Sequence, residues 1–75
     1  MRVVKTILSD DGDHRLQILA DGDIFRASED ARATTYDGEQ CWTPAWPSGV
    51  YGMIADTAEI AEAEARARIP WLPGL

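Results

Sequence analysis

The sequence predicts an α+β domain in which an antiparallel meander of three to four strands packs against one C-terminal helix, at about 56–69. Two observations predict this fold class. Segments rich in Val, Ile and Leu in the first half are punctuated by Asp-Gly pairs, the strongest short-range signal for a β-hairpin. The second half contains one long segment with helix start and stop signals. The Asp-Gly pairs lie at 11–12, 21–22 and 37–38.

The length and charge of the chain limit what it can be. A chain of 75 residues is a single domain, 1–75, with a thin core. A net charge of −6 disfavours direct binding to nucleic acid or to an anionic membrane, and is compatible with a basic partner protein. The sequence has no apolar run long enough for a signal peptide or a membrane span, so we expect a cytoplasmic protein. Cys41 is the only cysteine, which excludes an internal disulfide and a cysteine-based metal cluster.

The first predicted hairpin joins strands at 2–8 and 14–20 through a loop around 10–13. Two sets of inward-facing residues are open: Val4, Thr6 and Leu8 for a loop of three or five residues, or Val3, Lys5 and Ile7 for two or four. We favour the first set because it keeps Lys5 in water.

The second predicted hairpin turns at Asp21-Gly22. A two-residue turn there places Ile18 opposite Phe25 and Leu16 opposite Ala27, with all four side chains towards the core. The same register pairs Leu19 with Ile24 on the outer face.

Residues 28–33 fit either a short helical turn capped by Ser28 or an irregular continuation of the third strand, and we favour an extended, bulged strand. A third hairpin is expected around Asp37-Gly38. Prolines and glycines then break regular structure, so 44–55 is expected to connect the sheet to the helix.

The predicted helix begins with an acidic cap at Asp56, from which Glu59 completes a capping box, and ends before Pro70. Its spacing produces two apolar seams: Ala58, Ala61, Ala65 and Ile69 on one stripe, and Ile60, Ala63 and Ala67 on the other. The first seam lets the helix lie close to the sheet. The second is either buried under 44–55 or exposed as an interface.

No residue pattern indicates a catalytic site. His14 after Asp13 and Cys41 beside Trp42 are better interpreted as a solvated strand-end histidine and a small buried hydrophobe. The acidic turns lack the spacing of an EF-hand loop, so we expect no metal and no cofactor. Our prediction is a protein that is not an enzyme.

Most acidic residues fall in the expected turns of the meander. They form either a solvated rim or a field that mimics nucleic-acid phosphate to a basic groove. Trp46, between two prolines, is the candidate exposed anchor, whereas Trp42 and Trp71 are expected in the core. The candidate partner-binding residues are Asp10, Asp11, Asp13, Asp21, Asp23, Glu29, Asp30, Asp37 and Trp46.

The C-terminal half carries a recurrent pattern: Trp42-Thr43-Pro44, Ser48-Gly49-Val50-Tyr51, an Ala/Glu/Arg helix, and Pro70-Trp71-Leu72. It resembles small uncharacterised proteins of bacteria and their mobile elements, a resemblance that implies no activity. A hairpin followed by Gly-Val-Tyr and a Thr-x-x-x-Ala-x-x-x-Ala helix also resembles the partial RNase H fold of HicB-type antitoxins, although the strand that usually follows the helix is missing here. In size and acidity the chain is similar to phage-encoded anti-CRISPR inhibitors.

These observations favour a non-enzymatic protein-binding module. Its most specific form is an acidic inhibitor, DNA-mimic or anti-CRISPR-like, that blocks a nucleic-acid-binding groove on a basic partner protein. The alternatives are a structural or assembly homodimer and a HicB-like antitoxin module.

Overall fold

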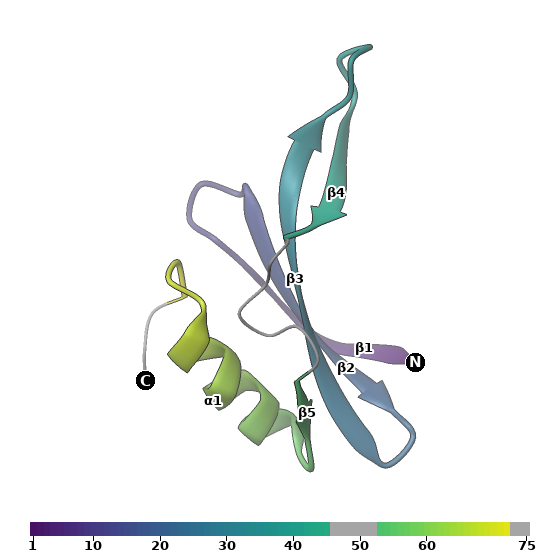
Figure 1. Cartoon of the computed structure of the whole chain (residues 1–75), viewed down its shortest axis with the longest axis vertical. Helices are drawn as coiled ribbons and strands as arrows, with labels where there is room; N and C mark the ends of the chain where they lie inside the picture. The colour runs from purple at the N-terminus through teal and green to yellow at the C-terminus, as the bar shows by residue number, and fades with distance from the viewer. Residues whose placement is uncertain (46–52, 73–75) are drawn as a thin grey trace.

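The computed structural model of the chain describes residues 1–45 and 53–72, and it has two layers (Figure 1). One layer is an antiparallel sheet in the order β1-β2-β3-β4, and the other is the C-terminal helix α1, which packs on one face of that sheet. The predicted α+β fold class is confirmed. The elements are β1 (Arg2–Leu8), β2 (His14–Asp21), β3 (Ile24–Thr34), β4 (Gln40–Pro44), β5 (Ile54–Ala55) and α1 (Ala58–Arg68).

β5 is a strand that the sequence prediction missed. Its two residues pair with Phe25 and Arg26 near the start of β3, whereas β4 pairs with the other end of β3 along the same edge. β3 is 11 residues long, which gives both strands room. A two-residue strand within a predicted connection has no periodic pattern of its own.

The inward face of β1 differs from the favoured prediction. Ile7 pairs with the buried Leu16 and packs against the core, whereas Leu8 on the other face is 56% exposed. The amide of Ser9 donates to the carbonyl of His14 at 2.9 Å, which leaves the four residues 10–13 to close the loop, and a bulge after Val3 shifts the register. Lys5 faces the helix side opposite Ile18, because an acidic side chain on α1 compensates its charge there.

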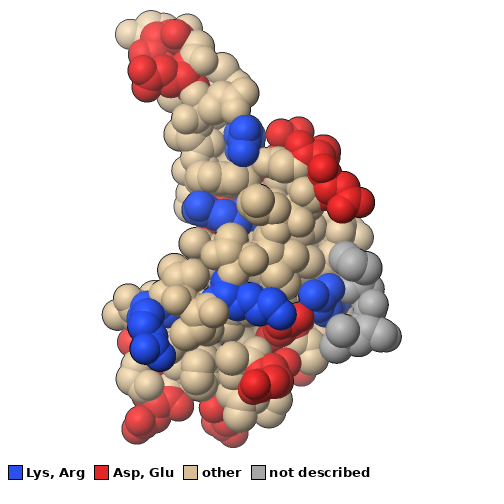
Figure 2. All heavy atoms as spheres, turned by 180° about the vertical axis from the view of Figure 1, so that it is seen from behind, with Lys and Arg blue, Asp and Glu red and all other residues tan. Residues whose placement is uncertain are grey.

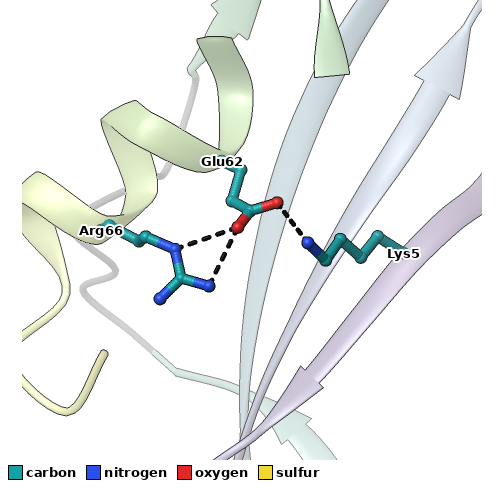
Figure 3. A network of polar contacts seen from close by, with 3 residues as sticks. All are labelled: Lys5, Glu62 and Arg66. Carbon is teal, nitrogen blue, oxygen red and sulfur yellow. Dashed lines mark hydrogen bonds and ion pairs between the residues drawn. The ribbon is translucent and has the colours of Figure 1, made fainter. Parts of the chain in front are cut away.

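That compensation links the two layers of the molecule (Figure 3). Lys5 Nζ lies 2.7 Å from Glu62 Oε1, and the guanidinium of Arg66 binds Oε2 of the same carboxylate at 2.9 Å. The hydrogen bond from Lys5, followed by that from Arg66, holds the pKa of Glu62 below its usual 4.5. The folded state therefore prefers the ionised carboxylate.

Glu62→Gln is expected to lower the free energy of unfolding by about 1–2 kcal/mol at pH 7. Because folding lowers the pKa of Glu62, the contribution is complete above the unfolded value and disappears as pH falls through the folded value. Urea denaturation should therefore separate the variant from the wild type at pH 7, and the difference should shrink as pH falls below the unfolded pKa of Glu62. The matched control is Glu64→Gln, which removes the exposed pair with Arg68 at 3.4 Å and should change stability by less than about 0.5 kcal/mol. Equal losses for the two variants would contradict a special role for Glu62.

The β2–β3 hairpin turns one residue later than predicted. Its turn residues are Gly22 and Asp23, so Ile18 faces Ala27 and Leu19 faces Arg26. Gly22 has a φ of 63° and Asp23 does not have a positive φ, which is the sign pattern of a type II′ turn with glycine first. The register moves by two residues, and a shift of two preserves the faces. The prediction that Leu16, Ile18, Phe25 and Ala27 share the core side is therefore confirmed, and the pairing of Leu19 with Ile24 is wrong.

Residues 28–33 continue β3 as extended strand, as favoured, with no bulge in the pairing with β2. The third hairpin is also confirmed. It closes through the three residues 36–38, with Gly38 at a φ of 92°.

α1 begins later than predicted. Thr57, in extended conformation, is the N-cap, and its Oγ1 accepts a hydrogen bond of 3.1 Å from the amide of Ile60. Asp56 therefore does not cap the helix. The chain leaves the helix at Ile69, before Pro70.

The first alanine seam forms the contact between the layers, as predicted. Ala61 and Ala65 are fully buried and Ile69 almost so, against Leu16 and Ile18 of β2. Because alanine has no side chain beyond Cβ, α1 lies close to the sheet and the strands supply the bulk of the core. The second seam is exposed: Ile60 is 49% exposed, and Ala63 and Ala67 also face solvent.

Candidate protein-binding surfaces

The β1–β2 loop presents three exposed carboxylates, at Asp10, Asp11 and Asp13. The hydroxyl of Ser9 and the amide of Asp13 both donate hydrogen bonds to Asp11 Oδ1. These bonds, that from Ser9 first, lower the pKa of Asp11. The loop therefore holds an ionised carboxylate in a fixed orientation.

The β3–β4 turn repeats this arrangement. The hydroxyl of Thr35 donates to the carboxylate of Asp37, and the amide of Glu39 donates to Thr35 Oγ1 at 3.1 Å. The hydrogen bond from Thr35, followed by that from the Glu39 backbone, lowers the pKa of Asp37. In an antiparallel meander the first loop and the third turn lie at the same end of the sheet, and the amide of Arg32 ties β3 to the first loop through the carbonyl of Asp13 at 2.8 Å. We call these two segments the acidic end, defined by Asp10, Asp11, Asp13, Asp37 and Glu39.

The structure does not bring the other predicted acids to this end. Asp21 and Asp23 belong to the β2–β3 turn at the opposite end, where Asp21 binds Arg26 at 3.1 Å. Glu29 and Asp30 lie within β3 rather than in a turn. Trp46 lies outside the described residues.

Asp30 is buried, so it cannot serve as one of the exposed partner-binding acids. It is 7% exposed, and its Oδ2 accepts two hydrogen bonds from Arg15, at 3.0 Å from Nε and 2.7 Å from a terminal nitrogen. Its charge is thereby neutralised within the sheet. Glu29, on the helix side, accepts a hydrogen bond of 3.0 Å from the indole nitrogen of Trp71.

The ion pairs of the described residues leave the excess negative charge in the turns. The acids in these ion pairs include Asp21, Asp30, Glu62 and Glu64. Among residues 1–45 and 53–72, no ion pair engages any carboxylate of the acidic end. Figure 2 shows this charge distribution from behind: acidic side chains form separate groups, at the upper tip, on one flank and in the lower half of the molecule, and basic side chains lie between them.

The two described tryptophans differ in environment. Trp71 packs against the core, as expected, and its ring stacks on that of His14 with the ring centres 5.7 Å apart. The buried Nδ1 of His14 has no hydrogen-bond partner among the described residues. Trp42 is outside the core, contrary to expectation, and lies on the opposite face of the sheet beneath Arg15 and Arg32. Cys41 is exposed rather than buried.

The hollows of the described surface are small. The one lined by Arg32, Gln40, Cys41 and Trp42 has a volume of about 230 Å³, below the roughly 300–1,000 Å³ typical of small-molecule sites. The described residues contain no group of three side chains placed to hold a metal ion. None of the helices described is long and apolar enough to cross a membrane.

Comparison of the chain with family models, curated proteins and solved structures finds no match. The acidic end and the exposed second seam of α1 are therefore the features from which a function can be argued.

Proposed function

We propose that this chain is a non-enzymatic protein-binding module, and specifically a small acidic inhibitor of the DNA-mimic or anti-CRISPR type. In this proposal the acidic end occupies a nucleic-acid-binding groove on a basic partner protein. The observation that carries it is the placement of unpaired carboxylates on two turns at one end of the sheet.

Two properties of these turns support the proposal. The hydrogen bonds from Ser9 and Thr35 orient Asp11 and Asp37 before binding, which reduces the entropy lost when a partner immobilises them. The same bonds lower both pKa values, so the charges persist at any physiological pH. The carboxylates of the acidic end form no ion pair within the described residues, so their charge is available to steer a basic partner into place.

The proposal is tested with two variants that remove the same number of charges. Asp10→Asn/Asp13→Asn/Asp37→Asn removes three of the five negative charges of the acidic end, and asparagine keeps an oxygen acceptor in each turn. Asp23→Asn/Asp56→Asn/Glu59→Gln neutralises three exposed acids around the β2–β3 turn and the start of α1. Both variants should remain folded by circular dichroism.

The immobilised protein is exposed to nuclease-treated host lysate, and the captured protein is then purified and titrated. We expect the first variant to bind at least tenfold more weakly and the second to bind within threefold of the wild type. Wild-type binding should weaken steeply as salt increases, and the protein should displace DNA or RNA from its partner. Equal losses for the two variants, or a partner that retains its nucleic acid, would sink the proposal.

A homodimer is the second candidate, and it is favoured by the exposed seam at Ile60, Ala63 and Ala67. The sheet edges offer less support for self-pairing. The edge strand β1 has a bulge after Val3 and an inward-facing Lys5, and the other edge strand, β4, ends at Pro44. Each of these features opposes the pairing of a sheet edge with the edge of another chain. Light scattering over a concentration series, with Ile60→Asp as the disrupting variant, distinguishes a dimer from a monomeric inhibitor.

A further inference from the structure

The sheet has one face that no described helix or strand covers. Directly opposed residues of an antiparallel sheet point to the same side, so the pairing defines this face. One row across it is Val3, Leu19, Arg26 and Ile54, and a second is Leu8, Arg15, Asp30 and Pro44. Arg32 and Trp42 are opposed beyond the second row. We call this surface the open face.

Large apolar side chains are exposed on the open face. Val3 is 47% exposed, Leu8 56% and Ile54 55%, and they come from three positions on β1 and β5. Contiguous exposed apolar surface marks interaction sites, and in the first row Val3 adjoins Leu19, whereas Arg26 lies between Leu19 and Ile54. Arginine side chains lie between these exposed apolar side chains and do not cover them.

An arginine and tryptophan cluster lies at the other end of the open face. The guanidinium carbons of Arg15 and Arg32 lie 4.5 Å and 5.1 Å from the centre of the Trp42 ring. Arg15 is neutralised by Asp30, whereas the side-chain hydrogen bond that Arg32 makes within the described residues, of 2.9 Å, goes to the neutral amide of Gln40. Arg32 therefore presents an ordered, uncompensated cation beside the hollow of about 230 Å³.

This face is less acidic than the chain as a whole. It carries Arg15, Arg26 and Arg32. Asp30 and Asp21 pair with the first two, and among the described residues no ion pair engages Arg32. The net charge of the whole chain is −6. Tryptophan and arginine are also the side chains that dominate binding energy at protein interfaces.

We propose that the open face is the docking site for an extended, acidic segment of a partner protein. A carboxylate of that segment binds Arg32 beside Trp42, and apolar side chains cover the row of Val3, Leu19 and Ile54. Arg32 lies six residue steps along β3 from Arg26, about 20 Å of extended chain, so a segment of about seven residues spans both contacts. The apolar row favours a protein segment over a nucleic acid, because a phosphate backbone offers Val3, Leu19 and Ile54 no apolar partner. This surface does not depend on the acidic end.

The probes are two capped octapeptides, each with two leucines at one end, two glutamates at the other and serines between, in opposite sequence directions. Each is titrated into ¹⁵N-labelled protein and followed by NMR. We expect one direction to shift amides of β1, β3 and β4 and the Nε–H signal of Arg32, at submillimolar to millimolar affinity. No binding by either peptide at 5 mM, roughly the weakest affinity of use to such a segment, would overturn the proposal.

Matched variants localise the contact. Arg32→Gln keeps a donor for Gln40 and should weaken the peptide at least fivefold, whereas Arg68→Gln, an exposed arginine on α1, should leave its affinity unchanged. The triple variant Asp10→Asn/Asp13→Asn/Asp37→Asn should bind the peptide as the wild type does, which separates this surface from the acidic end. Equal effects of the two arginine variants, or larger shifts with an oligothymidylate of the same charge, would contradict an acidic protein segment as the ligand.

Discussion

Ala65→Leu is expected to lower the free energy of unfolding by about 2–3 kcal/mol. Ala65 is fully buried where α1 lies on the sheet, so a larger side chain must push the helix away from Leu16 and Ile18 or adopt a strained rotamer. A domain of this length has a total stability of roughly 4–11 kcal/mol, so the loss is a large fraction of it. Thermal and urea denaturation measure the effect.

Ala63→Leu is the matched control for this prediction, because the same substitution on the same helix falls in the exposed seam. Leucine and alanine differ little in helix propensity, and nothing described covers Ala63, so stability should change by less than about 0.5 kcal/mol. If Ala63→Leu were as destabilising as Ala65→Leu, both seams would have to be packed. A gain in self-association by Ala63→Leu would instead mark the outer seam as the homodimer surface.

The buried seam was predictable because its spacing is a property of the helix alone. Once residues near 56–69 are helical, Ala61, Ala65 and Ile69 share a stripe, whatever packs against it. The faces of β2 and β3 were predictable for the same reason, because strand alternation survives a register error of two residues.

Features that depend on contacts between distant segments were not predictable in this way. Lys5 faces the helix side because Glu62, 57 residues away in sequence, binds it there. The turn at Gly22 and Asp23 and the cap at Thr57 are choices between adjacent residues of similar propensity, decided by local geometry. β5 exists because β3 offers an unpaired edge beside it.

The acidic turns were predicted from composition, but their internal arrangement was not recognised. A hydroxyl residue two positions before an aspartate occurs in both turns, Ser9 before Asp11 and Thr35 before Asp37, and this spacing was the available signal. Asp30 was grouped with the acids expected in the turns of the meander, but it lies within β3. Its burial follows from its pairing with Arg15 across the strands, which requires the register.

Asp30→Ala is expected to lower the free energy of unfolding by about 2–4 kcal/mol. It leaves the mostly buried guanidinium of Arg15 without the carboxylate that accepts both of its hydrogen bonds. Removing one partner of such a pair costs far more than the net contribution of the pair, because the remaining charge is poorly hydrated. The measurement is urea denaturation, with circular dichroism to confirm a folded baseline.

The double variant Arg15→Met/Asp30→Leu distinguishes the stranded charge from lost packing. Methionine can contact the Trp42 ring in place of the guanidinium, and leucine fills the space of the carboxylate, so stability should return to within about 1 kcal/mol of the wild type. Recovery of stability would show that Asp30→Ala is destabilising because it leaves the charge of Arg15 uncompensated, and that the sheet does not need this ion pair in order to fold. A double variant as unstable as Asp30→Ala would show instead that the hydrogen-bonded geometry of the pair sets the packing of β2 against β3.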